Sequence, residues 1–400
     1  MNPKKKNLIP MSSPEITDVD REAVLSVLDT KYLSIGPRIK EFEAAIREYI
    51  GSQSAIGVSS GTSGLHLCIR AAKIEPGDLV ITTPFSFVSS TNVILFERAI
   101  PVFVDVEANT GNLDMQQTLE AVEDLLSGGK RAEKWLPRKG AGTTCRLKAV
   151  LPVDVFGQPA DYDILMGISK QHNLTLIEDS CEALGAEYKG KKAGKFGDYG
   201  VFAFYPNKQI TTGEGGVIVT DNPEAANLMK ALRNQGRAPG DTWLQHTYLG
   251  YNYRLNEMSA ALGLTQLARI EAILLRREQV AHWYNQYLKD TQEVEIPFIA
   301  PATTRMSWFV YVIRIAKHID RKLLAACLEK EGIAVRPYFS PIHLQPYMIE
   351  RFGYQRGDYP ITEDLGKRGL ALPFSSIMSQ EQVALVCEKL RTCIRKFSHK

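Results

Sequence analysis

The stretch YGVFAFYPNKQITTGEGGVIVT, Tyr199–Thr220, decides how this chain folds. Two short apolar runs, Tyr199–Phe204 and Gly216–Thr220, flank a turn that carries one lysine and three glycines within four positions. Such runs are typical of strands buried on both faces. The lysine between them has three interpretations: an exposed charge in a hairpin, a phosphate ligand, or a desolvated amine nucleophile.

Five similar runs precede this stretch, at residues 55–58, 79–82, 101–105, 148–153 and 174–179. Helix-length segments separate several of them, including 62–73 and 161–172. Alternation of strands and helices predicts an α/β fold whose mostly parallel, seven-stranded sheet is flanked by helices.

After Leu255 the pattern changes to one or two long helices, which are followed by a second α/β segment. We predict there a strand at 308–315, a helix at 320–331 and a C-terminal helix from Ser379 onward. The expected organisation is an N-terminal segment, 1–30, that packs with a small C-terminal domain, 271–400, and a large domain, 31–270. The basic, glycine-containing segment Ser127–Arg146 predicts a loop or insertion.

The chain has 400 residues, 44% of them hydrophobic and 23% charged, which is typical of globular proteins. A formal charge of +3 gives no indication of a nucleic-acid partner. Six cysteines without a Cys-x-x-Cys pair indicate reduced thiols, and neither a disulfide nor a zinc framework. No run reaches the roughly 18 apolar residues that a membrane helix needs. We expect a cytoplasmic protein with no membrane or nucleic-acid partner and no metal site.

Two polar clusters follow predicted strands, at the edge where open parallel sheets bind ligands. Ser60, Gly61 and Thr62 lead from a strand into a helix, where free backbone N–H groups suit a phosphate. An ordinary helix cap is the alternative. Glu178 and Asp179 end another strand, and a carboxylate there suits a protonated ring nitrogen. A capping role for the next helix is again the alternative.

An aromatic pair, Phe85 and Phe87, follows the strand 79–82 and suits either stacking on a flat ligand or core packing. Phosphate cradle, aromatic ring, carboxylate and Lys208 occur in that order along the chain. Together they form the set of contacts that pyridoxal 5′-phosphate requires.

The chain resembles the nucleotide-sugar aminotransferases of the DegT–StrS type, which are fold-type-I pyridoxal-phosphate enzymes, over about residues 10–374. The segments that carry the resemblance are, in order, YLSIGPRIKEFE, SSGTSGLHL, VDVFGQPADYD, EDSCEALGA, YPNKQITTGEGG, GYNYRLNEMSAALG and PIHLQPY.

The resemblance implies a role for each matching residue. Lys208 would form the internal aldimine and move the proton, and Asp179 would bind the pyridine nitrogen. Gly61 and Thr62 would bind the cofactor phosphate, and Phe87 would stack on the cofactor ring.

Asn252 matches a residue that reaches the cofactor phosphate of the neighbouring subunit, which implies a homodimer with shared active sites. Arg254 beside it is a weaker candidate, for which we expect a structural salt bridge. Two positions depart from the family pattern: Ala203 replaces a phosphate-binding serine, and Glu182 replaces a glutamine or histidine near the cofactor.

Tyr338 and His343 are candidate substrate contacts, with a buried structural histidine as the alternative for His343. The segment 234–237 and the loop after it are expected to cover the site.

The resemblance implies transfer of an amino group from L-glutamate to a nucleotide-linked 4-keto-6-deoxyhexose, with pyridoxamine 5′-phosphate formed in the cycle. The alternatives are a sugar dehydratase, whose relatives carry histidine in place of Lys208, and a non-catalytic regulatory relative. The nucleotide and the choice between C3 and C4 stay open.

Overall fold

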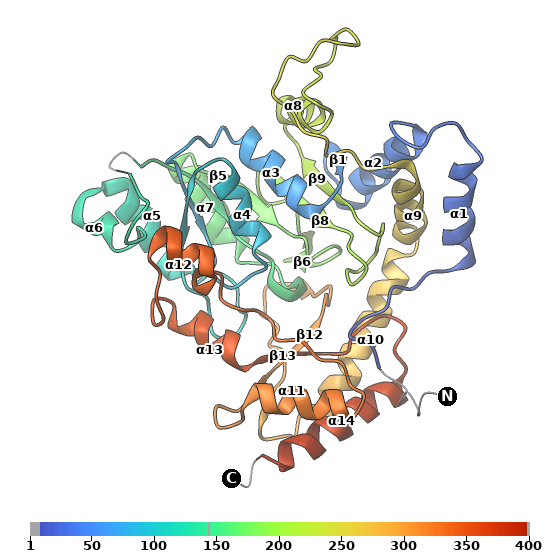
Figure 1. Ribbon diagram of the computed structural model, residues 1–400, viewed down its shortest axis with the longest axis vertical. Helices are drawn as coiled ribbons and strands as arrows, with labels where there is room; N and C mark the ends of the chain where they lie inside the picture. The colour runs from blue at the N-terminus through green and yellow to red at the C-terminus, as the bar shows by residue number, and fades with distance from the viewer. Residues whose placement is uncertain (1–8, 143–144, 398–400) are drawn as a thin grey trace.

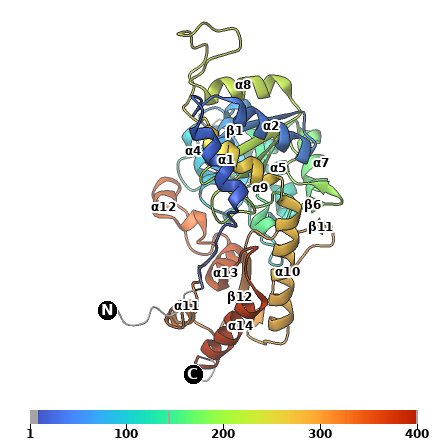
Figure 2. The same cartoon turned by 90° about the vertical axis from the view of Figure 1, so that its right-hand side faces the viewer.

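The computed structural model describes residues 9–142 and 145–397. The first eight residues of the expected N-terminal segment, residues 143–144 of the expected insertion and the last three residues of the expected small domain lie outside this range. Within it, a large α/β body carries a smaller one, as Figures 1 and 2 show.

A seven-stranded sheet forms the centre of the large body. Its strands, in spatial order, are β1 (Ser54–Val58), β9 (Gly216–Thr220), β8 (Tyr199–Ala203), β5 (Thr175–Asp179), β4 (Leu147–Leu151), β2 (Leu79–Thr82) and β3 (Ile100–Phe103). Only β9 runs antiparallel to its neighbours β1 and β8, and the other pairs are parallel. The predicted fold class and sheet are confirmed.

Helices cover both faces of this sheet, because successive side chains of a strand point to opposite sides. In β8, Val201 packs in the cluster under α3 (Gly61–Ala71) and α8 (Pro223–Arg233), whereas Phe202 packs in the cluster with α2 (Pro37–Ile50). The remaining helices of this body are α4 (Ser89–Phe96), α5 (Met115–Ser127), α6 (Gly129–Glu133), α7 (Tyr162–His172) and α9 (Glu257–Leu267). The short helix α6 lies inside the segment expected to be a loop or insertion.

A long helix, α10 (Ile270–Leu288), runs from the large body to the small one, where Tyr284 joins the second core (Figure 1). Among the described residues no single helix is long and apolar enough to cross a bilayer; α9 and α10 meet that test only as a pair bent by 66°.

The small body is built on an antiparallel sheet in the order β10 (Val294–Glu295), β12 (Tyr311–Ile315) and β13 (Gly369–Leu372). Helices α11 (Arg321–Lys330), α13 (Pro360–Arg368) and α14 (Gln380–Arg395) accompany it. Helix α12 (Pro346–Phe352) packs instead against the large body, where Met348 and Phe352 join a cluster with residues of β2 and β3. A third small sheet joins β11 (Thr303–Arg305), β6 (Glu187–Tyr188) and β7 (Lys191–Lys192). The strand predicted at 308–315 starts only at Tyr311, because Trp308 has a positive φ of 50°, which no regular strand accepts.

The N-terminal segment contacts both bodies. Ile9 forms a parallel bridge with Ile333 of the small body. Helix α1 (Asp18–Leu28) packs instead against α9, where the buried Asp20 accepts hydrogen bonds from Thr265 and Gln266 at 2.6 and 3.0 Å. Only the start of this segment therefore packs with the small body. The domain bounds stay predictions.

One expectation about the cysteines is wrong. Cys327 in α11 and Cys393 in α14 form a disulfide, with their Cα atoms 6.0 Å apart. The two residues are 66 positions apart in sequence, and only the packing of α11 against α14 brings them together. The other four cysteines, Cys68, Cys145, Cys181 and Cys387, are free thiols.

Candidate active site

A cavity of about 730 Å³ opens at the edge of the large sheet where the parallel strands end. It is bounded by the start of α3, the turn after β2, the ends of β5 and β8, and a segment of the small body. These parts supply Ser60, Gly61, Thr62, Ser86, Phe87, Ser89, Ser90, Asp179, Cys181, Glu182, Ala203, Lys208, Phe309, Tyr338 and Phe339, among others. A cleft at the carboxyl ends of strands is where open α/β sheets bind ligands.

Lys208 lies in the turn after β8, with its amide donating to the Tyr205 carbonyl at 2.9 Å. Its side chain is only 13% exposed. The ammonium group Nζ lies 3.7 Å from Glu182 Oε1 and 3.9 Å from the ring centre of Phe309. The surface-charge interpretation of this lysine therefore fails, because the amine points into the cavity and touches protein on two sides.

Asp179 ends β5, the strand beside β8, and its side chain is held from two directions. Ser90 Oγ donates to Oδ2 at 2.6 Å, and the Cys181 amide donates to Oδ1 at 3.2 Å. The side chain is 5% exposed and lines the cavity, so a carboxylate stands fixed beside the space that Lys208 faces.

The predicted phosphate cradle lies in the first turn of α3. Ser60 caps this helix by accepting a hydrogen bond from the Ser63 amide at 3.0 Å. The amides of Gly61 and Thr62 precede that bond, in the turn whose N–H groups have no partner within the helix. The cap interpretation is confirmed. It does not exclude the cradle, which stays a prediction, because Gly61 and Thr62 line the cavity.

Gly61 and Ala203 are both small residues at a point where α3 lies close to β8. A Cβ added at Gly61 would lie 2.8 Å from Ala203 Cβ and 2.8 Å from Cys181 Sγ. Glycine at position 61 therefore lets α3 lie this close to β8. The family serine is absent at position 203, but hydroxyls of Ser60, Thr62 and Ser89 line the same cavity. Thr62 Oγ1 and Ser89 Oγ are 2.9 Å apart.

The two phenylalanines after β2 lie in different environments. Phe85 is buried in the core at 2% exposure, whereas Phe87 lines the cavity with 63% of its surface exposed. The ring of Phe87 is therefore available to a flat ligand, and Phe85 is a core residue.

Glu182 is buried within the site. Its Oε2 accepts a hydrogen bond from the Phe156 amide at 2.9 Å, and its Oε1 faces Lys208. Burial raises the pKa of this carboxyl, and the charge of Lys208 partly opposes that effect.

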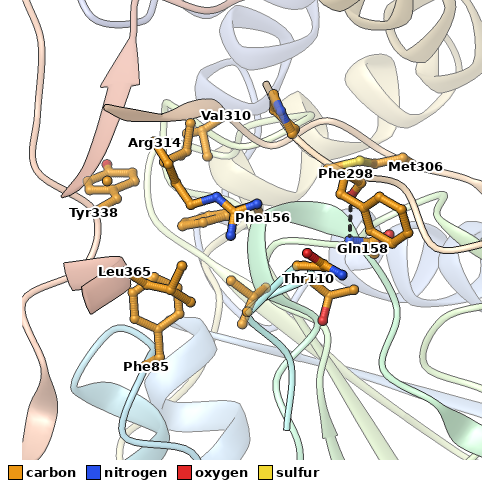
Figure 3. Close-up of a pocket in the computed structure, with 16 residues that line it drawn as sticks. Phe85, Thr110, Phe156, Gln158, Phe298, Met306, Val310, Arg314, Tyr338 and Leu365 are labelled. Carbon is orange, nitrogen blue, oxygen red and sulfur yellow. Dashed lines mark hydrogen bonds between the residues drawn. The ribbon is translucent and has the colours of Figure 1, made fainter. Parts of the chain in front are cut away.

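The structure separates the two candidate substrate residues. Tyr338 lines the main cavity and also a smaller one of about 50 Å³, which Figure 3 shows between Phe156, Arg314 and Phe85. His343 is fully buried instead, with Nε2 3.2 Å from Glu363 Oε1. Burial lowers its pKa. Its side chain does not line the main cavity. His343 therefore fits the alternative interpretation, a buried structural histidine.

Asn252 and Arg254 lie away from this cavity. Asn252 is exposed and forms a bridge with Asn234. The salt bridge expected at Arg254 is not among the ion pairs of residues 9–142 and 145–397. Its guanidinium donates instead to the amide oxygen of Asn234, Oδ1, at 3.1 Å.

The loop after residue 237 does not cover the site of its own chain, contrary to expectation. It projects from the end of the large body opposite the small one, as Figures 1 and 2 both show. A turn within it, closed by the Ala238 amide donating to Asp241 at 2.7 Å, directs the chain outward.

Three residues of the site were missed in the sequence. Ser90 stands in the polar run after Phe87, a signal that could have marked it as a partner for a carboxylate. Phe309 lies inside the stretch predicted to be strand, where an apolar residue carries no signal of a site. Arg277 donates to the Lys208 carbonyl from α10, 69 positions away, and no local pattern marks it.

The model of the DegT/DnrJ/EryC1/StrS aminotransferase family matches residues 14–391. The chain belongs to this family. The GDP-perosamine synthase of Caulobacter vibrioides is 36% identical over 386 residues, which cover 96% of this chain and 97% of that protein. The predicted family and pyridoxal-phosphate-dependent aminotransferase activity are thereby confirmed.

Solved structures of DegT/StrS relatives agree with this fold. PseC of Helicobacter pylori, an aminotransferase involved in the biosynthesis of pseudoaminic acid, superposes with a TM-score of 0.85 at 29% identity, over 98% of this chain and 100% of that one. The PLP form of Spr1654 from Streptococcus pneumoniae gives 0.85 at 26% identity, over 98% and 99%.

Proposed function

We propose that this DegT/StrS aminotransferase moves an amino group from L-glutamate to the keto group of a nucleotide-linked deoxysugar, a 4-keto-6-deoxyhexose. One observation carries the proposal. The Lys208 amine and the Asp179 carboxylate extend from the ends of neighbouring strands, β8 and β5, into one cavity that the first turn of α3 also borders. An amine, a carboxylate and a helix N-terminus are the donor set that fits pyridoxal 5′-phosphate.

Each of these groups has a distinct task. The amides of Gly61 and Thr62 would bind the cofactor phosphate, and Asp179 would hold the pyridine nitrogen protonated. Phe87 would cover one face of the ring. When bound, the cofactor supplies an electron-withdrawing ring that stabilises negative charge on the carbon next to the reacting nitrogen. Lys208 Nζ would hold the cofactor covalently at rest and accept or return a proton during transfer.

Glu182 would hold a carboxyl group near Lys208 Nζ, with its other oxygen fixed by the Phe156 amide. Tyr338, from the small body, would contact the sugar at the mouth of the cavity. The name of the Caulobacter relative supports GDP as the first nucleotide to test.

We extend the proposal to a cytoplasmic homodimer with shared sites. Asn252 is exposed and lies outside the cavity of its own chain, as a residue that serves a partner must. The projecting loop also exposes Trp243, Leu244 and Leu249 at 77%, 83% and 83%, an apolar surface that suits burial against a second subunit.

The test starts with the cofactor. Purified protein should become yellow with added pyridoxal 5′-phosphate, and borohydride should fix the cofactor to the peptide that contains Lys208. Lys208→Ala should take no label under the same conditions. Failure to bind the cofactor, or a label on another lysine, would contradict the assignment.

The substrate is tested separately with a panel of GDP-, UDP- and dTDP-linked keto sugars, each with L-glutamate, by following 2-oxoglutarate release. We expect turnover with a 4-keto-6-deoxy sugar. Turnover of 3-keto sugars alone would overturn the choice of position, and turnover of free keto acids alone would overturn the sugar acceptor.

A further inference from the structure

A buried arginine lies behind the lysine. Arg277 belongs to α10, the helix that links the two bodies in Figure 1, and it is only 3% exposed. Its guanidinium donates to three backbone carbonyls: Nη2 to Lys208 at 2.7 Å, and Nη1 to Trp308 at 3.1 Å and to Phe309 at 3.3 Å. One side chain thus ties the turn after β8 to the segment that leads into β12.

This arginine has no counter-ion in the described part of the chain. No ion pair among residues 9–142 and 145–397 includes Arg277, and its buried Nε has no hydrogen-bond partner there. Burial alone lowers its pKa to about 10. A buried cation without a carboxylate is costly, and an apolar side chain of similar volume is often the more stable choice. Stability alone therefore does not explain an arginine here.

The two segments that Arg277 joins carry side chains that meet. Lys208 Nζ lies 3.9 Å from the ring centre of Phe309, within the distance of a cation–π contact. Lys208 belongs to the large body and Phe309 to the entry of the small one. A planar guanidinium can bind both backbones at once in a fixed geometry, which the single ammonium group of a lysine cannot reproduce.

A second bridge follows the same route. Gln209 Nε2 donates to Ser307 Oγ at 2.8 Å and to the Glu182 carbonyl at 2.6 Å. Gln209 follows Lys208 directly and Ser307 lies two positions before Phe309, so the same two segments are joined a second time. The bond to the Glu182 carbonyl adds the residue whose carboxyl group faces Lys208. Arg277 is the charged part of this contact, and all three side chains, Arg277, Gln209 and Ser307, are buried.

We propose that Arg277 is a positioning residue, which clamps the backbones of Lys208 and Phe309 and so fixes where Lys208 Nζ stands in the cavity. The proposal rests on the proposed role of Lys208. Arg277 touches neither cofactor nor sugar in this account, so its loss should slow the steps at Lys208 and leave sugar binding nearly unchanged.

Arg277→Met, which removes the donors and keeps the length, tests the proposal, with Arg277→Lys as the conservative variant. Arg276→Met is the matched control, because Arg276 is the neighbouring residue of α10, with a side chain that is 46% exposed and pairs with Glu15. All purified holoenzymes are assayed at one temperature, at least about 15 °C below the lowest Tm among them, so that unfolding does not enter the rate.

Misplacement of a reacting group by about 1 Å can cost about 100-fold in rate, so we expect Arg277→Met to lower kcat about 10- to 100-fold. The KM for the keto sugar should stay within about twofold of wild type, because the contacts that bind the sugar do not change. In the cofactor-free protein, a small aldehyde with borohydride should label Lys208 more slowly in this variant. Arg277→Lys should fall between wild type and Arg277→Met, and Arg276→Met should match wild type.

A folded Arg277→Met whose kcat and labelling rate equal those of wild type overturns the proposal, as does an equal loss in Arg276→Met. If Arg277→Met does not fold, Arg277→Lys decides: wild-type rates in that variant overturn the clamp. Failure of the proposed function gives a different result, since in that case borohydride would not fix pyridoxal 5′-phosphate to Lys208 even in wild type.

Discussion

Glu182 places a second carboxyl beside the amine of Lys208, and its titration can be followed without any substrate. Because burial raises its pKa above the ordinary 4.5, the group adds stability that is complete below about pH 4.5 and lost as the pH rises through the folded-state value. Glu182→Gln removes this titration. The cofactor-free variant should therefore have a higher Tm than wild type at about pH 8.

The difference in Tm should shrink as the pH falls toward about 4.5, where the wild-type carboxyl is protonated. Differential scanning calorimetry across this range measures it. Glu214→Gln is the control, since Glu214 lines the same cavity but is exposed. A Glu182→Gln protein less stable than wild type at high pH would show that the ion pair with Lys208 outweighs the cost of burial.

At the scale of single residues, the sequence predicted those that stand at strand ends. Lys208 and Asp179 follow apolar strands, and the edge of a parallel sheet brings such positions together. Arg277 and Phe309 could not be found this way, because their contacts with Lys208 depend on how α10 and the small body pack. His343 is the opposite case. Its motif suggested a substrate contact, but the side chain is buried and pairs with Glu363.

Among the elements, α3 carries the clearest test, because its cap and its cradle share one turn. Ser60→Ala removes the hydrogen bond to the Ser63 amide and should cost about 1 kcal/mol of unfolding free energy. The amides that face the cavity would lose their fixed direction. We expect a several-fold higher Kd for pyridoxal 5′-phosphate, measured by absorbance titration, where about 1.4 kcal/mol corresponds to tenfold.

Asn222→Ala provides the control for α3. Asn222 caps α8 by accepting from the Glu224 and Ala225 amides, each at 3.0 Å, and it does not line the cavity. The two variants should lose similar stability, but only Ser60→Ala should weaken cofactor binding. An equal Kd in both would mean that the Ser60 cap does not hold the amides of α3 in place for the phosphate.

Strand positions were predicted to within one or two residues, because apolar runs of this kind fit only a buried sheet. The small body was harder. Trp308 interrupts an apolar run that reads as one strand, and its positive φ has no local sequence signal such as glycine. The disulfide between Cys327 and Cys393 was missed for a related reason, since it depends on helix packing.

At the scale of the whole molecule, the shared site can be tested by mixing two inactive proteins. Lys208→Ala and Asn252→Ala should each have little activity as homodimers. In a mixed dimer one site carries both substitutions and the other carries neither. Random exchange at equal amounts should therefore restore about a quarter of wild-type activity, because half the dimers are mixed and each has one intact site.

Activity is assayed after dissociation and joint refolding, and each variant refolded alone is the control. No gain over the separate variants would contradict a site built from two chains. A mixture of Lys208→Ala with Lys208→Arg should stay inactive, since no arrangement of those chains regenerates the lysine.

The division of the cavity wall between two bodies has a consequence for how such an enzyme can change. The groups that handle nitrogen stand on the sheet of the large body, whereas Pro337, Tyr338, Phe339 and Ser340 come from a separate stretch of the small one. If Tyr338 contacts the sugar as proposed, substitutions in that stretch should alter which acceptor is admitted and leave the groups on the sheet intact. New acceptors should thus be accessible to selection through four consecutive positions, and a library confined to them is the natural start for redesign.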